Sequence, residues 1–383
     1  MTKLMLIPGP TKVDEEVLLE LSKQVIPHYG LEWKNLYDET ANYIKQIFNT
    51  TGYITLLPLP GTVSIELGIF NVIENAGDKV ICLNNGFFMD QIERQLRSHG
   101  ANIISLKSDY GFPLNTDLLD ETIRENPDVK AIFMVHNETS TGVLNDVAKV
   151  GRIVRKYDKL LCVDAVSSFG GIEFDFDSWG VDYAVGYASK CLSGINGIVP
   201  VAISDRFFNY VNNRKVSVKS YFFNLSTYLE MSEFTPNHPH PTSMPTSVVS
   251  ALHLAAKLAV EEGLKERYER HAKIAKAYRA AFRSLDLEVI PREDYASPTV
   301  TAVATSEEVG KTLVSKLLKD HGIMVGGGLG KLKGKSLRIG HMGNAANSSV
   351  LLQFVSALEM TLRDMGIRVN FGSGIEAVYE VLK

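Results

Sequence analysis

Short apolar runs separated by amphipathic patterns are the feature of this sequence that most constrains its fold. Each pair of neighbouring runs is separated by enough chain for one helix. Runs of this length, bounded by glycine and charged residues, are typical of buried strands in a parallel sheet. The alternation therefore predicts an α/β fold in which helices cover both faces of a mostly parallel sheet. The runs lie at residues 79–83, 102–106, 130–135, 160–163 and 183–187.

Two of these runs deliver reactive side chains to the same edge of the sheet. The run 160–163 ends in Asp164, and the run 183–187 ends just before Ser189 and Lys190. Ligands of open α/β sheets bind at the carboxyl ends of the strands. An acid and a lysine in these places suit pyridoxal phosphate (PLP), because the lysine forms a Schiff base and the acid faces the pyridinium nitrogen.

Each of these two residues has a physical reason to be buried. A lysine attacks an aldehyde only as the neutral amine, so a partly desolvated site that lowers its pKa favours the reaction. A buried carboxylate favours the protonated ring nitrogen opposite to it. Either residue alone would usually be a solvated charge at a strand end, and it is the pair that favours a cofactor site.

The rest of the chain is predicted to add a smaller unit. Four prolines make residues 234–246 irregular, and a long amphipathic helix over residues 264–285 then leads into an α+β unit. We expect an N-terminal segment over residues 1–20, a large domain over 21–260 and a small domain over 261–383. Strands are also predicted at residues 50–59, 198–204, 287–290, 299–304, 323–325 and 336–339. Helices are predicted at residues 15–23, up to Phe48, 63–73, 88–98, 117–125, 147–157, 247–262, 307–321 and 349–365.

Composition excludes several classes of protein. The 383 residues carry a formal net charge of −4 without a basic block, so nucleic acid and anionic membranes are poor partners. No run approaches a membrane span, and the N-terminus lacks the features of a signal peptide. The three cysteines have no metal-ligand spacing and are expected to be buried thiols in a cytoplasmic protein.

Several motifs resemble one family. The chain is similar to class V (fold type I) PLP-dependent aminotransferases, in the branch of alanine–glyoxylate and serine–glyoxylate or serine–pyruvate aminotransferases. The resemblance covers nearly the whole chain and implies a large domain with a seven-stranded sheet, a small α+β C-terminal domain and a homodimer with shared active sites. The motifs are PGPT at 8–11, NGFF at 85–88, HNETSTGVLND at 136–146, VDAVSSFGG at 163–171, ASK at 188–190 and LRIGHMG at 337–343.

The resemblance assigns a role to each residue around the cofactor ring. Lys190 is the Schiff-base lysine and the proton shuttle, and Asp164 pairs with the ring nitrogen. Val166 matches the small residue that packs on one face of the ring. Phe88 stands where the family has an aromatic residue on the other face, and any flat side chain can stack there. Thr139 matches a hydroxyl residue that bonds the phenolic oxygen.

The phosphate is expected at a helix start. Gly61 and Thr62 lie where a strand turns into a helix, and free N–H groups at such a place favour an anion. By resemblance Ser189 also contacts the phosphate, and His240 and Ser243 reach it from the partner subunit. The chain departs from the family here, because the family often has serine before the Gly-Thr pair, and tyrosine and threonine at the last two positions.

The resemblance also indicates the substrates. Arg338 matches the arginine that clamps the substrate carboxylate, for which a guanidinium fork is suited. Gly9 of the N-terminal segment and Tyr29 of a nearby loop are further candidates for contact with substrate. The implied reaction is a ping-pong transamination, in which serine or alanine donates the amino group and glyoxylate or pyruvate accepts it.

Other functions stay open at this point. Phosphoserine aminotransferase and cysteine desulfurase are class V relatives, but a desulfurase needs a cysteine on a C-terminal loop and the last cysteine here is Cys191. A non-catalytic scaffold on the same fold is opposed by the intact pair of acid and lysine. The glycine-rich residues 326–336 depart from a nucleotide-binding loop, because Leu329 stands where that motif needs glycine. His238 and His240 have no nearby carboxylate, so no metal site is predicted.

Overall fold

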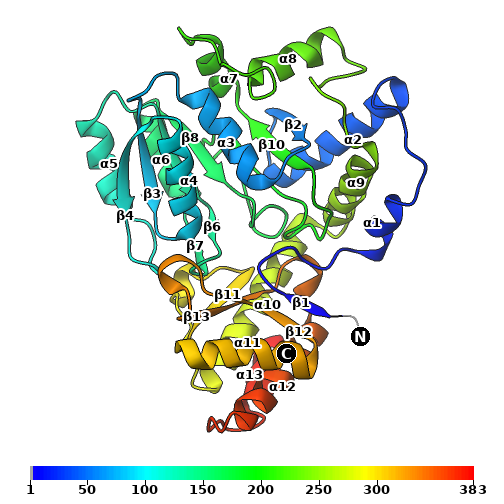
Figure 1. Ribbon diagram of the computed structural model, residues 1–383, viewed down its shortest axis with the longest axis vertical. Helices are drawn as coiled ribbons and strands as arrows, with labels where there is room; N and C mark the ends of the chain where they lie inside the picture. Colours follow the sequence, from blue (N-terminus) through cyan, green and yellow to red (C-terminus); the bar gives the residue numbers. More distant parts are fainter. Residues whose placement is uncertain (1–2) are drawn as a thin grey trace.

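A computed structural model describes residues 3–383 and shows two main sheets, each with its own helices, and a short two-stranded hairpin (Figure 1). The first two residues of the predicted N-terminal segment 1–20 lie outside the described residues. The larger sheet has seven strands, in the order β2 (Tyr53–Leu57), β10 (Val199–Ile203), β9 (Tyr183–Val185), β8 (Leu160–Asp164), β5 (Ala131–Val135), β3 (Lys79–Asn84) and β4 (Asn102–Lys107). The predicted fold class is confirmed.

Strand direction in this sheet follows the connections between the strands. Strands β9, β8, β5, β3 and β4 pair in parallel. Helices lie between β3, β4, β5 and β8 along the chain, and a loop without a helix leads from β8 to β9. Strand β10 runs antiparallel to both of its neighbours, β2 and β9. The register sets Asp164 opposite Val185, so the last residue of β8 lies beside the last residue of β9.

Side chains of the large sheet alternate between two buried faces. Along β3, Ile81 and Leu83 point into one core, and Val80 and Cys82 point into the other. Because both faces are buried, the strands are almost wholly apolar. The first face is covered by α2 (Leu31–Phe48), α5 (Thr116–Glu125), α6 (Val147–Lys156) and α9 (Thr246–Glu261). The second is covered by α3 (Gly61–Val72), α4 (Phe87–Ser98), α7 (Asp205–Asn212) and α8 (Leu225–Phe234).

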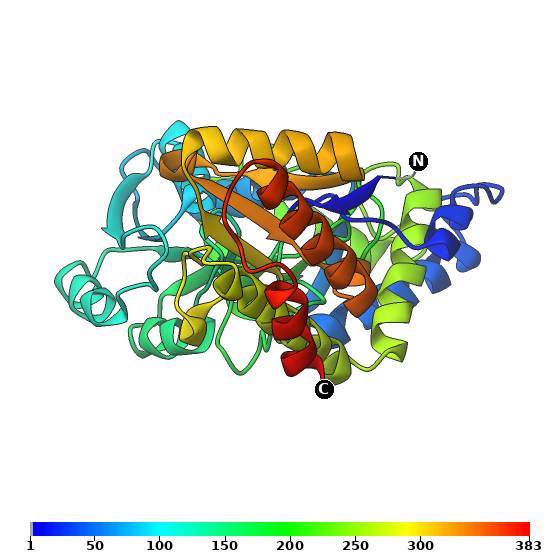
Figure 2. The ribbon, with the colours of Figure 1, turned by 90° about the horizontal axis from the view of Figure 1, so that it is seen from below.

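The smaller sheet joins the two ends of the chain. Its order is β1 (Leu4–Leu6), β12 (Ile323–Gly327), β13 (Ser336–Gly340) and β11 (Val300–Ala304). Strand β1 is parallel to β12, and the other pairs are antiparallel. Its core is shared with α10 (Leu264–Ser284), α11 (Glu307–His321), α12 (Ser348–Asp364) and α13 (Ser373–Leu382) (Figure 2). From β1 the chain passes beside the large unit to α1 (Glu15–Glu20), which packs on α9.

The structure corrects several local predictions. Residues 287–290 form no strand, because Val289 makes only an isolated bridge to Val303. The predicted helix over 15–23 already ends at Glu20. Sequence reasoning missed helices α7, α8 and α13, the short hairpin of β6 (Asn137–Glu138) and β7 (Val143–Leu144), and three 3₁₀ turns. These turns are Glu293–Tyr295, Gly330–Leu332 and Gly343–Ala345. Among the described residues, no helix is long and apolar enough to cross a membrane.

Candidate active site

Lys190 lies in a turn beyond β9, and the N-terminal segment closes over it. The Thr11 N–H donates to the Ser189 carbonyl at 3.0 Å, and the Thr11 hydroxyl donates to the Lys190 carbonyl at 2.8 Å. The Lys190 Nζ donates to the Pro8 carbonyl at 2.6 Å. A Cβ at Gly9, which has φ +94°, would overlap Lys190 Nζ, so this close approach requires glycine. Gly9, which was predicted to contact substrate, thus lies directly on Lys190, and its contact with substrate stays a prediction.

Asp164 and Lys190 share one partly buried environment. The Asp164 carboxylate accepts a hydrogen bond from the Val166 N–H at 2.9 Å. Burial raises the pKa of Asp164 to about 6 and lowers the pKa of Lys190 to about 8. The charges oppose these shifts, because Asp164 and Lys190 are close enough for each to stabilise the ionised form of the other. The amine can thus lose its proton near neutral pH, as an attacking amine must.

The start of α3 offers an anion site next to Val166. The N-cap residue Pro60 makes no side-chain capping bond, and the first N–H groups of any helix lack partners inside the helix. A Cβ at Gly61 would lie 2.9 Å from Val166 Cγ2, so the helix start packs directly on that side chain. Thr62 follows with an exposed side chain. An anion bound at this helix start would lie beside Val166.

Arg338, in the middle of β13, is a buried cation with spare hydrogen-bond donors. Its side chain is 8% exposed, its Nε donates to the Gly327 carbonyl at 2.8 Å, and its Nη1 lies 3.5 Å from the Thr139 carbonyl. Burial lowers the pKa of Arg338 to about 10. No carboxylate within residues 3–383 forms an ion pair with it. A substrate carboxylate would supply the partner that this guanidinium lacks.

Glu138 is a residue of this site that sequence reasoning missed. Its buried carboxyl accepts hydrogen bonds from the Phe88 N–H at 3.0 Å and from the Ser140 hydroxyl at 2.6 Å. Burial raises the pKa of Glu138 to about 7. A Cβ at Gly86 would overlap this carboxyl, so the start of α4 lies directly on it. Glu138 therefore fixes Phe88 in place. One sequence feature could have revealed Glu138: it is the only acidic residue within the otherwise uncharged residues 136–144.

The structure argues against the role predicted for His240. The side chain is fully buried, and its Nε2 accepts a hydrogen bond from Trp33 Nε1 at 2.9 Å. Its Nδ1 therefore carries the proton and donates to the Thr242 carbonyl at 2.6 Å. Both ring nitrogens are thus used within the chain, which leaves none for the phosphate of a partner subunit. We leave His240 out of the proposed site.

Two further predicted residues lie on the surface. Ser243 is exposed, and Tyr29 is 62% exposed. Within the described residues, neither side chain hydrogen-bonds to Lys190 or Arg338. The roles predicted for both of them would require a second subunit and stay predictions.

The donor set fits PLP. Asp164 can face a ring nitrogen, Lys190 can attack an aldehyde, and the start of α3 can hold a phosphate. Val166 and Phe88 are partly buried apolar side chains, and their predicted packing on the two faces of the ring stays a prediction. Thr139 is buried beside the Arg338 guanidinium. Among the described residues, no cluster of His, Cys, Asp or Glu could hold a metal ion.

Comparisons with known proteins agree with this geometry. The Aminotransferase class-V family profile matches residues 7–334. The chain is 33% identical to serine–glyoxylate aminotransferase of Arabidopsis thaliana, over 99% of this chain and 95% of that one. It is 30% identical to L-aspartate–glyoxylate aminotransferase of Paracoccus denitrificans, over 98% and 94%. The crystal structure of ureidoglycine–glyoxylate aminotransferase from Bacillus subtilis superposes with a TM-score of 0.93 at 28% identity, over 100% of this chain and 98% of that one. The chain therefore belongs to the class V aminotransferases, a family of enzymes whose cofactor is PLP.

Proposed function

We propose that this enzyme transfers the amino group of a small amino acid, serine or alanine, to glyoxylate or pyruvate in two successive half-reactions. The observation that carries the proposal is the buried Arg338 guanidinium, which has no carboxylate partner among the described residues and lies close enough to Lys190 to influence its pKa. One such cation suits one carboxylate, which favours monocarboxylic donors. The three relatives named above have glyoxylate in their names as a common acceptor, whereas their donors differ.

The chain's own groups divide the work of the reaction. Bound PLP supplies an electron sink for the negative charge that develops at the substrate α-carbon. Asp164 stabilises positive charge on the ring nitrogen, and Arg338 orients the substrate by its carboxylate. Lys190 Nζ, once neutral, would take the proton from the substrate α-carbon and deliver it to the cofactor within the same half-reaction, and would carry a proton the opposite way, to the α-carbon, in the reverse half-reaction. Gly61, Thr62 and Ser189 are proposed to hold the phosphate, and Thr139 the phenolic oxygen.

We also propose a homodimer in the cytoplasm. Apolar side chains of one segment are exposed, which is expected of a surface that a second chain covers. They are Leu18, Leu19, Val25 and Leu31, with Tyr29 among them. Cys82, Cys162 and Cys191 are buried thiols, which suits a reducing compartment. Light scattering that gave the mass of a single chain would overturn the dimer.

The proposed domain boundaries follow the separate cores of the two sheets. The small core holds Leu6 and otherwise only residues beyond 273. The two large cores lie within residues 33–259. We propose a large domain over 21–260 and a small domain over 261–383, with residues 1–20 packing against both. Limited proteolysis should cut between the two units before it cuts within either.

A half-reaction screen tests the function. The PLP-loaded protein is mixed with single amino acids, and loss of the absorbance of the lysine-bound cofactor is followed by stopped flow. Serine and alanine are expected to react fastest, with aspartate and glutamate as the dicarboxylic comparison. A second mixing step with glyoxylate or pyruvate should restore the absorbance. If no amino acid bleaches the cofactor, the proposed function fails, and if aspartate reacts fastest the donor class is wrong.

The pH dependence of cofactor attachment follows from the buried amine. The rate constant with which the apoenzyme binds PLP covalently is expected to rise with pH through a midpoint near 8, because only neutral Lys190 reacts and burial lowers its pKa to about 8. An exposed lysine would give a midpoint above about 10. Asp164→Asn should move the midpoint to lower pH, because it removes a negative charge that favours the charged amine. A midpoint above 10 in the wild type would contradict the prediction.

A further inference from the structure

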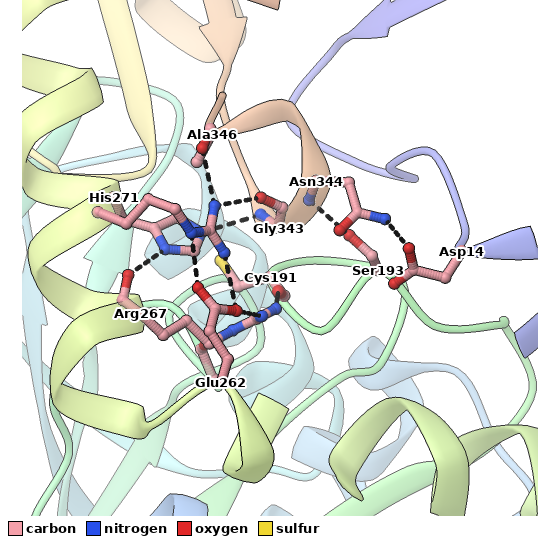
Figure 3. Close-up of polar contacts among 11 residues, drawn as sticks. Asp14, Cys191, Ser193, Glu262, Arg267, His271, Gly343, Asn344 and Ala346 are labelled. Atoms are coloured by element: carbon pink, nitrogen blue, oxygen red, sulfur yellow. Dashed lines mark hydrogen bonds and ion pairs between the residues drawn. The ribbon is translucent and has the colours of Figure 1, made fainter. Parts of the chain in front are cut away.

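The turn that follows Lys190 has an unusual backbone and several outside supports. Ser193 has φ +54°, a left-handed conformation that residues other than glycine rarely adopt. Its carbonyl accepts a hydrogen bond from the Asp14 N–H at 3.4 Å, and its hydroxyl accepts one from the Asn344 N–H at 2.9 Å. The Asn344 side chain in turn donates to Asp14 Oδ1 at 2.6 Å (Figure 3). The turn is therefore held from outside by segments that lie far from it in sequence.

Arg267 of α10 holds the other side of this turn. Its side chain is only 5% exposed, and its Nη2 donates to the Cys191 carbonyl. Its Nε donates to the Gly170 carbonyl at 2.7 Å, and its Nη1 pairs with Glu262 (Figure 3). The planar guanidinium of Arg267 thus joins two segments. One is the loop after β8, the strand that ends at Asp164, and the other is Cys191, the residue after Lys190. A lysine could not reproduce this, because an ammonium lacks the fixed directions of a guanidinium.

The next turn of α10 extends these contacts to the segment that follows β13, the strand that carries Arg338. His271 Nε2 accepts a hydrogen bond from the Gly343 N–H at 2.9 Å, so the proton lies on Nδ1, which donates to the Arg267 carbonyl at 2.8 Å. Arg270 Nη1 donates to the carbonyls of Gly343 at 3.0 Å and Ala346 at 2.7 Å. Burial lowers the pKa of His271 to about 3, which keeps the ring in this neutral form.

Gly343 makes direct contact with the lysine turn. It has φ +56°, and a Cβ there would overlap the Ser193 hydroxyl and lie 2.9 Å from the Cys191 carbonyl. Gly343 follows β13, the strand of Arg338, after two residues. The group that is proposed to move the proton and the group that is proposed to clamp the carboxylate are therefore joined through one compact set of contacts.

We propose that Arg267 is a positioning residue, which holds the turn of Lys190 at a fixed place relative to Asp164 and Arg338. This inference rests on the proposed function. The guanidinium binds the backbone of the two segments that follow β8 and β9, at Gly170 and Cys191. Glu262, just before α10, pairs with the guanidinium, and His271 of α10 bonds the Arg267 backbone carbonyl. When the fork is lost, the Cys191 carbonyl loses the guanidinium that donates to it, and the Cys191 thiol, a weak donor 3.3 Å from the Ser167 carbonyl, stays as a tie to the loop after β8.

The test compares two buried arginines of the same helix. Arg267→Lys keeps the charge and loses the fork, and Arg279→Lys is the matched control. Arg279 is also 5% exposed and also joins a carboxylate, Glu293, to a carbonyl, that of Ser297. We expect Arg267→Lys to lower kcat about 10- to 100-fold with KM changed less than threefold, since a displacement of about 1 Å can cost that much rate. Arg279→Lys should stay within threefold of the wild type in both constants at a similar loss of Tm.

Two readouts separate positioning from general destabilisation. With α-deuterated alanine, Arg267→Lys should show a larger isotope effect than the wild type, because proton removal by Lys190 becomes slower than the other steps. The rate constant for covalent binding of PLP to the apoenzyme should also fall in Arg267→Lys and not in Arg279→Lys. This second readout needs no amino acid, so it tests Arg267 even if the screen of donors fails.

The outcomes are distinct. Equal effects of Arg267→Lys and Arg279→Lys on kcat, isotope effect and PLP attachment would overturn the proposal. If Arg267→Lys does not fold, Ser193→Ala tests the opposite side of the same turn, because it removes the acceptor of the Asn344 N–H. A folded Ser193→Ala enzyme with a wild-type isotope effect and wild-type PLP attachment would then overturn it.

Discussion

Replacing Lys190 with alanine is expected to lower the rate of transamination by on the order of 10⁴-fold or more, because the change removes both the covalent attachment and the proton carrier. No other group described near the site can take over. Arg338 is the nearby cation, and its guanidinium holds its proton too firmly to serve as a base. The measurement is the steady-state formation of the 2-oxo acid from serine or alanine, with glyoxylate or pyruvate as acceptor.

The control for this variant is its cofactor. The other contacts of the site remain, so Lys190→Ala should still bind PLP without a covalent bond and should keep a Tm close to that of the wild type. Borohydride reduction followed by mass spectrometry should fix PLP on wild-type Lys190 and leave the variant unlabelled. A variant that turned over within tenfold of the wild-type rate would remove Lys190 from the mechanism.

Replacing Arg338 with alanine is expected to lower kcat/KM for the amino donor by roughly 10²- to 10³-fold, the cost of losing one partner of a buried charge pair. The effect should fall mainly on KM, since the guanidinium binds the substrate carboxylate and takes no part in moving the proton of the substrate α-carbon. Retention of PLP should change little, because the groups proposed to bind the cofactor lie on other elements. Steady-state kinetics with alanine, and dialysis of the loaded protein, measure the two quantities.

A substrate pair sharpens this test. Ethylamine is alanine without its carboxylate, so the wild type should strongly prefer alanine and Arg338→Ala should lose most of that preference. Arg338→Lys should recover only part of it, because the fork geometry is lost. Arg214→Ala serves as control, since Arg214 donates to the backbone carbonyls of Phe70, Asn71 and Ile73, away from the site. An unchanged preference in Arg338→Ala would place the carboxylate clamp elsewhere.

The starts of some helices could be predicted closely, because the residues that fix them are direct neighbours in the sequence. Asn115, Asp146 and Ser306 each accept a hydrogen bond from the start of the helix that they precede, so α5, α6 and α11 begin within a residue of the predicted positions. The buried strands likewise follow their apolar runs. Helix α13 was missed because it packs on α10, a contact between segments that are about a hundred residues apart.

In the candidate site, too, some residues could be named from local sequence and others could not. Asp164 and Lys190 could be named from sequence because they follow adjacent parallel strands, whose ends must meet at one edge of the sheet. For His240, the resemblance to a family position gave no hint that the ring would be buried and would accept a hydrogen bond from Trp33 Nε1. Sequence reasoning also missed Glu138, whose partners are the backbone N–H groups of another helix.

The sequence by itself determined where the strands of the large sheet lie along the chain, the class of cofactor and the residue types at the ends of β8 and β9, because periodicity and short motifs are local properties. Only the tertiary structure decided that Pro8 and Gly9 lie on Lys190 and that Arg338 is buried without a carboxylate partner among the described residues. It also decided that Arg267 joins the segments that follow β8 and β9. These contacts join segments up to about 180 residues apart. Such contacts depend on how whole units pack against each other, and no stretch of sequence specifies its distant neighbour.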